Sequence, residues 1–288
     1  MTNKQVDFKE VDVFTNVPYQ GNPVAVVMNG DGLTDQQMHQ IANWIHLSET
    51  TFVCQPTDPE ADYQLRIFTP NNELPFAGHP TIGSAHAVLQ GGLKPKHDGF
   101  LVQECKKGLV KIYKHGEELS FTLPEPERTV LSAEKNQLIS AALDIPVTDF
   151  KISEKVDVGA VWYTIQVKDA HQVVTTSPDM KLLAELSEPG VSGVTIFGAT
   201  SAGSDVKFEV RSFAPAEGAD EDPVCGSGNG CVAALVKAEH LVDGDQYTAG
   251  QGQCLGRNGK VKVRITDGQP ILVGGNAVVC IEGQIKRP

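Results

Sequence analysis

The sequence has no hydrophobic run long enough to cross a membrane as a helix. Spanning a bilayer takes about 20 consecutive apolar residues, and no stretch of the 288 residues approaches that length. The first residues also lack the basic-then-apolar layout of a signal peptide. We therefore expect a cytoplasmic protein with no membrane partner.

Basic residues are scarce in this chain. Lys and Arg number 24 against 36 Asp and Glu, which gives a formal net charge of −12. An acidic surface repels the phosphate backbone of nucleic acids, and no basic stripe in the sequence offsets that repulsion. We expect no nucleic-acid partner.

Cysteines are few and scattered. The closest two of the six are six residues apart, and the sequence has neither a C-x-x-C nor an H-x-x-x-H pattern. In a chain of this size without a secretion signal, such cysteines are typically reduced and buried. The sequence thus predicts neither a disulfide framework nor a metal site.

What the sequence does contain is a long motif that occurs twice. The residues 66–70 and 73–78, Arg-Ile-Phe-Thr-Pro and Glu-Leu-Pro-Phe-Ala-Gly, return at 211–215 and 221–226 as Arg-Ser-Phe-Ala-Pro and Glu-Asp-Pro-Val-Cys-Gly. The offset is 145 residues in the first part and 148 in the second, about half the chain. A repeat of that length indicates a duplicated half rather than a solenoid, whose period is roughly 20–50 residues.

Capping and proline signals locate several helices. Thr34 and Gln37 have the spacing of a capping box and predict a helix that ends near His46. Each motif turn leads into a further helix: Pro80 favours a first helical position with His79 as N-cap, so the first helix is expected at 80–90. The second such helix is expected at 228–239, and another at 132–143.

Apolar runs and alternating patterns predict the strands. We place them at 6–13, 23–28, 51–54, 61–69, 99–113, 118–123, 162–167, 194–199 and 206–213. The proline-rich stretch 124–128 is the best candidate for a linker. It divides the chain into an N-terminal lobe at 1–124, to which 276–288 can return, and a C-terminal lobe at 128–275.

The two copies differ in the side chains that could carry chemistry. Both turns place backbone N–H groups at a helix start, where the helix dipole favours an anion such as a carboxylate. The aligned positions, first copy then second, are Leu74 and Asp222, Ala77 and Cys225, and His79 and Ser227. A further carboxylate, Glu49, joins a predicted helix to an apolar strand. Taken singly, each residue has a structural interpretation as a cap, a turn former or a solvated loop residue.

Together these features resemble one known family over almost the whole chain. The residues that carry the resemblance are 11–14, 21–26, 48–52, 66–70, 73–81, 221–223 and 226–228. In this order and at these separations they are similar to the phenazine-biosynthesis-like (PhzF-like) isomerases.

The resemblance implies an α+β fold of the diaminopimelate-epimerase type. Two pseudo-symmetric lobes would each wrap a mostly antiparallel sheet around a central helix, with the ligand in the cleft between the lobes and a homodimer as the assembly. It also implies an isomerase without metal or organic cofactor, acting on a small carboxylate-bearing, cyclic, amino-acid-like substrate.

The resemblance further assigns roles to particular residues. Glu49 matches the general acid/base that takes a proton from one carbon and returns it at another, and enclosure of this carboxylate would favour the protonated form that the step requires. The supporting polar residues of the catalytic group are His79 and Asp222. The positions near the substrate carboxylate are Gly78, Gly226 and Ser227.

Two other functions stay open at this point. A two-cysteine racemase or epimerase shares the fold, but it needs a thiol at both turns, and Ala77 occupies the position that would pair with Cys225. A binding protein that senses a small carboxylate would use the same N–H groups without needing Glu49, His79 and Asp222 together.

Overall fold

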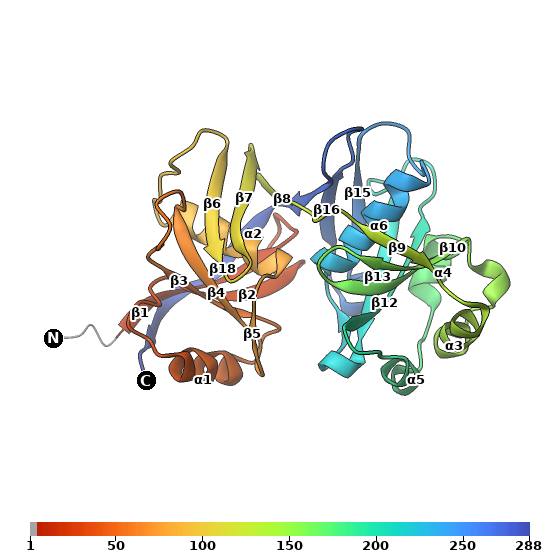
Figure 1. The fold of residues 1–288 in the computed structure, drawn as a ribbon, viewed down its shortest axis with the longest axis horizontal. Helices are drawn as coiled ribbons and strands as arrows, with labels where there is room; N and C mark the ends of the chain where they lie inside the picture. The colour runs from red at the N-terminus through yellow and green to blue at the C-terminus, as the bar shows by residue number, and fades with distance from the viewer. Residues whose placement is uncertain (1–4) are drawn as a thin grey trace. The chain divides into compact units, whose positions relative to one another are not determined.

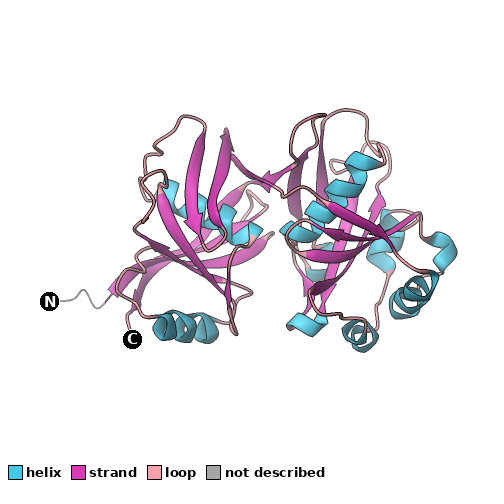
Figure 2. Ribbon diagram, in the orientation of Figure 1, coloured by secondary structure: helices cyan, strands magenta, loops and turns pink. Residues whose placement is uncertain are grey.

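The computed structural model describes residues 5–288 and divides the chain into two compact units. The first unit continues to Phe121 and resumes at Gly274–Pro288, and the second unit is Thr122–Val273. Residues 1–4, which the sequence-based division places in the first lobe, lie outside the described part. Strands dominate the regular structure of each unit (Figure 2). Among the described residues, no helix has both the length and the apolar character needed to cross a membrane.

The first unit is a curved, mostly antiparallel sheet. Its strands run in the spatial order β18, β1, β2, β3, β4, β6, β7 and β8, with the pairs β2–β3 and β4–β6 parallel. The short β5 pairs with β4. The strand bounds are β1 Gln5–Val13, β2 Asn22–Val27, β3 Thr50–Cys54, β4 Tyr63–Phe68, β5 Glu73–Leu74, β6 Phe100–Cys105, β7 Gly108–His115, β8 Glu118–Thr122 and β18 Ala277–Lys286.

A buried helix, α2 (Gly78–Gln90), packs inside this sheet against β1, β2 and β18 (Figure 1). Its packing is close, because a Cβ added at Gly83 would meet Val24 Cγ1 at 2.4 Å. The other helix of the unit, α1 (Asp35–Ile45), covers β3 and β4 with its apolar face. Its predicted capping box is confirmed, and His46 ends it in the left-handed conformation.

The second unit repeats this plan. Its strands run in the order β9, β10, β11, β12, β13, β15 and β16, with β11–β12 and β13–β15 parallel. The strand bounds are β9 Glu127–Val130, β10 Ile152–Asp157, β11 Val161–Gln166, β12 Val191–Ala199, β13 Phe208–Ala214, β14 Ala219–Asp222, β15 Gln246–Gln251, β16 Gly259–Arg264 and β17 Leu272–Gly275.

The central helix of the second unit is α6 (Gly226–Ala238), which packs against β10, β11, β12 and β16 (Figure 1). The outer helices contribute residues to a hydrophobic core that includes Ile139, Leu183 and Phe213. The bounds of the remaining helices are α3 Ala133–Leu143, α4 Ala170–Thr175, α5 Met180–Glu185, and the 3₁₀ turns η1 Val147–Asp149, η2 Pro215–Glu217 and η3 Gln253–Leu255. The predicted α+β fold, a sheet around a central helix in each half, is confirmed.

The repeated motif forms the same brace in both units. In the first unit the Arg66 guanidinium donates through Nε and Nη2 to the two carboxylate oxygens of Glu73, at 2.9 and 2.7 Å. In the second unit Arg211 does the same to Glu221, at 2.9 and 2.8 Å. Each two-pronged pair joins a strand to the short strand that precedes the central helix, a geometry that fixes orientation as well as distance.

The predicted helix starts need correction. We expected His79 as N-cap of the first central helix, but Ala77 is the N-cap and His79 lies inside the first turn. The second central helix likewise begins at Gly226 rather than 228, with Cys225 as N-cap. Proline is tolerated throughout a first turn because no N–H there has an intrahelical acceptor, so Pro80 did not mark the first helical residue.

The predicted linker is also only partly a linker. We assigned 124–128 to a connection, but β9 begins at Glu127 and pairs with β10. The prolines at 124 and 126 do not prevent this, because a strand can begin directly after a proline.

Candidate functional site

In the first unit, Glu49 and His79 lie side by side. Glu49 precedes β3 in the loop after α1, and His79 is in the first turn of α2. His79 Nε2 and Glu49 Oε2 are 3.6 Å apart, and the two side chains are only 6% and 15% exposed. A carboxylate and an imidazole, far apart in sequence, thus share one enclosed place.

Burial decides the charge of this histidine. Desolvation lowers the pKa of His79 to about 4, although a hydrogen bond with the backbone of Pro23 acts in the opposite direction. The imidazole is therefore neutral near pH 7, and its contact with Glu49 is not an ion pair at that pH. With Nε2 facing Glu49, the other ring nitrogen is left to donate to Pro23, so Nε2 carries the lone pair.

Asp12 holds the turn that leads into β2, the strand that contains Pro23. The Asp12 Oδ2 accepts from the backbone N–H groups of Gln20 and Gly21, at 2.8 and 2.9 Å. Gly21 is required at this point because an added Cβ would lie 2.1 Å from Val13 O. This contact fixes the backbone just before Pro23, the residue whose backbone forms a hydrogen bond with His79.

In the second unit, Asp222 and the start of α6 form a compact turn. Asp222 ends β14, and its Oδ1 accepts from Val224 N at 3.0 Å. Desolvation raises the pKa of Asp222 to about 6, with a smaller upward contribution from the charge of Glu221 and downward ones from Val224 N–H and the Cys225 thiol. Asp222 can therefore gain or lose a proton close to neutral pH.

Ser227 and Gly226 follow in the first turn of α6. The indole Nε1 of Trp162 donates to Ser227 Oγ at 3.0 Å. Because that bond occupies an acceptor site of the hydroxyl, the Ser227 proton can be donated elsewhere. The first-turn N–H groups of a helix have no intrahelical acceptors, which holds for Gly226 and Ser227 here and for Gly78 at the start of α2.

Cys225 is a buried thiol rather than a reactive one. Its Sγ accepts from Gly228 N at 3.2 Å and caps α6. Burial, reinforced by the negative charge of Asp222, raises the pKa of this thiol well above its usual range. A thiol in that state is a poor nucleophile or base, since both roles need the thiolate.

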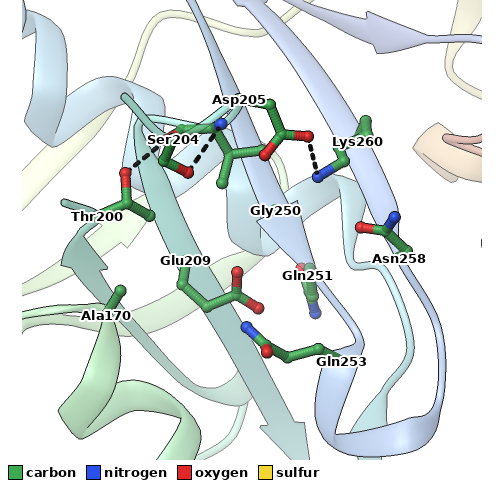
Figure 3. Close-up of a pocket in the computed structure, with 11 residues that line it drawn as sticks. Ala170, Thr200, Ser204, Asp205, Glu209, Gly250, Gln251, Gln253, Asn258 and Lys260 are labelled. Carbon is green, nitrogen blue, oxygen red and sulfur yellow. Dashed lines mark hydrogen bonds and ion pairs between the residues drawn. The ribbon is translucent and has the colours of Figure 1, made fainter. Parts of the chain in front are cut away.

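A separate polar pocket of about 250 Å³ lies in the second unit. Glu209 directs its carboxylate into it, and an ion pair of 2.9 Å joins Asp205 to Lys260 at its edge (Figure 3). Burial raises the pKa of Glu209, partly offset by a hydrogen bond from Gln253. None of the predicted site residues lines this pocket, but Gln251 does.

The structure thus brings the predicted residues together in two groups. Glu49, His79 and Gly78 gather in the first unit, and Asp222, Gly226 and Ser227 in the second. From the sequence we assigned no role to Trp162, which contacts Ser227, or to Gln251, which holds the Asp222 turn. Gln251 lies 148 residues after Gln103, the same offset as the two motif turns, and this spacing could have drawn attention to it. No local sequence pattern marks Trp162.

The fold defines a class of protein: duplicated α+β proteins in which the sheet of each half wraps around one central helix. A family model described as phenazine biosynthesis-like protein matches residues 11–283. The chain belongs to that family, and its predicted place among the isomerases is confirmed.

Named relatives agree with this assignment. The chain is 40% identical to antisense-enhancing sequence 1 of Schizosaccharomyces pombe, over 96% of this chain and 97% of that one. It is 30% identical to trans-2,3-dihydro-3-hydroxyanthranilate isomerase of Pseudomonas aeruginosa, over 95% and 97%.

Solved structures support the same fold. A PhzF-family phenazine biosynthesis protein of Bacillus anthracis superposes with a TM-score of 0.86 at 26% identity, covering 98% of this chain and 99% of that one. A hydroxyproline epimerase of Agrobacterium vitis reaches 0.64 at 13% identity, covering 99% and 93%, which shows a shared fold alone.

Proposed function

We propose that this protein moves a proton within a small, cyclic, carboxylate-bearing substrate, with Glu49 as the general acid/base. The observation that carries the proposal is the enclosed contact between Glu49 and a neutral His79. Because the imidazole is uncharged, it does not hold Glu49 permanently as a carboxylate, so this group can take up a proton and release it again.

The proposed step needs only one carboxylate. Glu49 removes a proton from one carbon, the C–H electron pair moves into the conjugated system of the substrate, and the resulting carboxylic acid returns the proton at another carbon. A double bond shifts and no atom is gained or lost, so we propose that no cofactor takes part. His79 Nε2 accepts a hydrogen bond from the protonated form of Glu49 and keeps it oriented between the two transfers.

The second group would bind and polarise the same substrate. We assign Gly78, Gly226 and Ser227 to the substrate carboxylate, because N–H groups at helix starts favour an anion. Asp222, with its pKa of about 6, would accept from a polar N–H or O–H of the substrate.

The two alternatives receive less support. A cysteine-dependent racemase needs two thiolates, whereas Cys225 is held as a thiol and Ala77 occupies the matching position. A sensor of small carboxylates would need the helix starts but would gain nothing from an enclosed acid/base pair. The net charge of −12 also gives no reason to propose nucleic-acid binding.

The test is proton NMR in D₂O with wild type and Glu49→Gln, using trans-2,3-dihydro-3-hydroxyanthranilate and pools of small cyclic carboxylic acids. We expect deuterium uptake or a shifted double bond with wild type alone. The amide keeps the shape of the side chain but cannot accept the proton, so turnover should fall by at least about 10³-fold. Ligand binding, measured by line broadening, should change little.

Two results would count against the proposal. A Glu49→Gln variant that keeps near wild-type turnover would overturn the role of Glu49. Line broadening by a ligand that undergoes no exchange with either protein would instead favour the sensor. We also expect the protein to act in the cytoplasm, which cell fractionation would check.

A further inference from the structure

One glutamine occurs at the same place in both units. Gln103 lies in β6 and Gln251 in β15, the strands that pair in parallel with β4 and β13. They are 148 residues apart, which is the offset of the two motif turns. Both are fully buried, at 0% and 1% exposure. A buried amide must find hydrogen-bond partners, so its contacts show its function in the structure.

Both glutamines contact the fourth residue of the central helix. Gln103 Nε2 donates to Thr81 Oγ1 at 3.1 Å, and Gln251 Oε1 accepts from Asn229 Nδ2 at 2.7 Å. Thr81 and Asn229 are themselves 148 residues apart. The duplication therefore preserved a contact from the sheet to the helix, although its chemistry differs between the halves.

Only the second glutamine also contacts the turn before its helix. Gln251 Oε1 accepts from Cys225 N at 3.1 Å, and its Nε2 donates to Asp222 O at 2.9 Å. The orientation of this amide is fixed, because its oxygen faces two N–H donors and its nitrogen faces a carbonyl. In the first unit, the other end of Gln103 accepts instead from the Tyr63 hydroxyl, at 3.0 Å.

We propose that Gln251 is a positioning residue that fixes the turn from Asp222 to Cys225 and thereby keeps the Asp222 carboxyl in its desolvated place. It joins both ends of the turn, through Asp222 O and Cys225 N, to the fourth residue of α6. Its importance for turnover rests on the function proposed above, whereas its effect on Asp222 does not.

The charges of the neighbouring titratable groups do not by themselves explain the raised pKa of the Asp222 carboxyl. Glu221 adds a negative charge that is already paired with Arg211, and Cys225 is a thiol. Desolvation is the largest influence on the pKa of Asp222. This desolvation depends on the turn staying closed, so loosening the turn should admit water to the carboxyl.

The test compares Gln251→Met with Gln103→Met, a matched control at the equivalent buried position. Methionine keeps the length and approximate volume of glutamine but makes none of its amide hydrogen bonds. The Asp222 titration is followed by ¹³C-carboxyl NMR and assigned with Asp222→Asn. We expect Gln251→Met to lower the Asp222 midpoint by about one pH unit, and Gln103→Met to leave it in place.

The two variants separate positioning from stability. Both lose buried hydrogen bonds and should unfold at lower urea concentrations, so an effect of stability alone would be common to them. A folded Gln251→Met protein with the wild-type Asp222 midpoint would overturn the proposal. An equal midpoint shift in both variants would overturn it too, because it would mark a general loosening.

A milder variant covers the case in which Gln251→Met does not fold. Gln251→Asn retains a buried amide but is one methylene shorter, so it cannot reach both Asn229 and Asp222 O. We expect the same direction of midpoint shift, and an unchanged midpoint would overturn the proposal. With a substrate in hand, kcat should fall by about 10-fold or more while KM changes less. If the wild-type protein shows no turnover but the Gln251 variants still shift the Asp222 midpoint, only the proposed function is contradicted.

Discussion

At the residue scale, the environment of each ionisable group matters more than its identity. His79 and Asp222 are both supporting polar residues in the family resemblance, and burial shifts their pKa values in opposite senses. Desolvation favours the neutral form, which for histidine is the deprotonated ring and for aspartate the protonated acid. One physical cause therefore leaves His79 without a charge at pH 7 and Asp222 able to titrate near it.

The raised pKa of Asp222 predicts a dependence of stability on pH. The folded state binds this proton more tightly than the unfolded state, since the pKa rises from 3.8 to about 6. The stabilisation is therefore fully present below pH 3.8 and is lost as the pH rises through 6. At pH 7 the half-buried carboxylate should cost about 1–3 kcal/mol of folding free energy.

Asp222→Asn should remove that cost. We expect the variant to be more stable than wild type by about 1–3 kcal/mol at pH 7.5 and indistinguishable from it below pH 4. Urea unfolding at a series of pH values measures the difference. A stability gap that does not change between pH 4 and 7.5 would show that Asp222 is not desolvated.

At the scale of elements, the repeated arginine–glutamate brace is built to different depths in the two units. The Arg211 and Glu221 side chains are 7% and 6% exposed, against 22% and 12% for Arg66 and Glu73. Glu73 also forms an ion pair with Lys106 at 2.6 Å. Among the described residues, Arg211 is the only basic side chain that pairs with Glu221. Breaking the Arg211–Glu221 pair should therefore lower the free energy of unfolding more than breaking the Arg66–Glu73 pair.

Removing the arginine should show this difference. We expect Arg211→Met to lower the free energy of unfolding by about 3–5 kcal/mol, because it leaves Glu221 buried without a partner. Arg66→Met should cost about 1–2 kcal/mol, since Lys106 still neutralises Glu73. Urea denaturation of both variants compares them directly, and equal losses would contradict the explanation.

The sequence determined the elements best where their signal is local. The capping box at Thr34 and Gln37 involves four consecutive residues, and it predicted the start of α1 correctly. The starts of α2 and α6 were placed two residues late, because the extended conformations of Ala77 and Cys225 depend on the strands before them. A proline or glycine signal alone could not locate that boundary.

At the scale of the whole molecule, the duplication organises fold and chemistry together. Each unit wraps its sheet around one helix, and the two helices begin at turns of matching sequence. The copies have diverged in side chains rather than in architecture: a glutamate–histidine contact lies in the first unit, and an aspartate with a raised pKa lies in the second. Family membership follows from the chain as a whole, since the match extends over residues 11–283.

The assembly stays a prediction. The family resemblance implies a homodimer, so light scattering coupled to size exclusion should give twice the chain mass of 30.9 kDa. A single-chain mass at micromolar concentration would contradict that expectation.

The sequence by itself determined the duplication, the α+β class and the isomerase family, because these depend on local patterns and on motifs repeated in order. Only the tertiary structure decided the neutral state of His79, its support by Pro23 and the clamp of Gln251 on the Asp222 turn. These features depend on desolvation and on hydrogen bonds between residues distant in sequence. Both exist only after the sheets have closed around their helices, so no pattern along the chain encodes them directly.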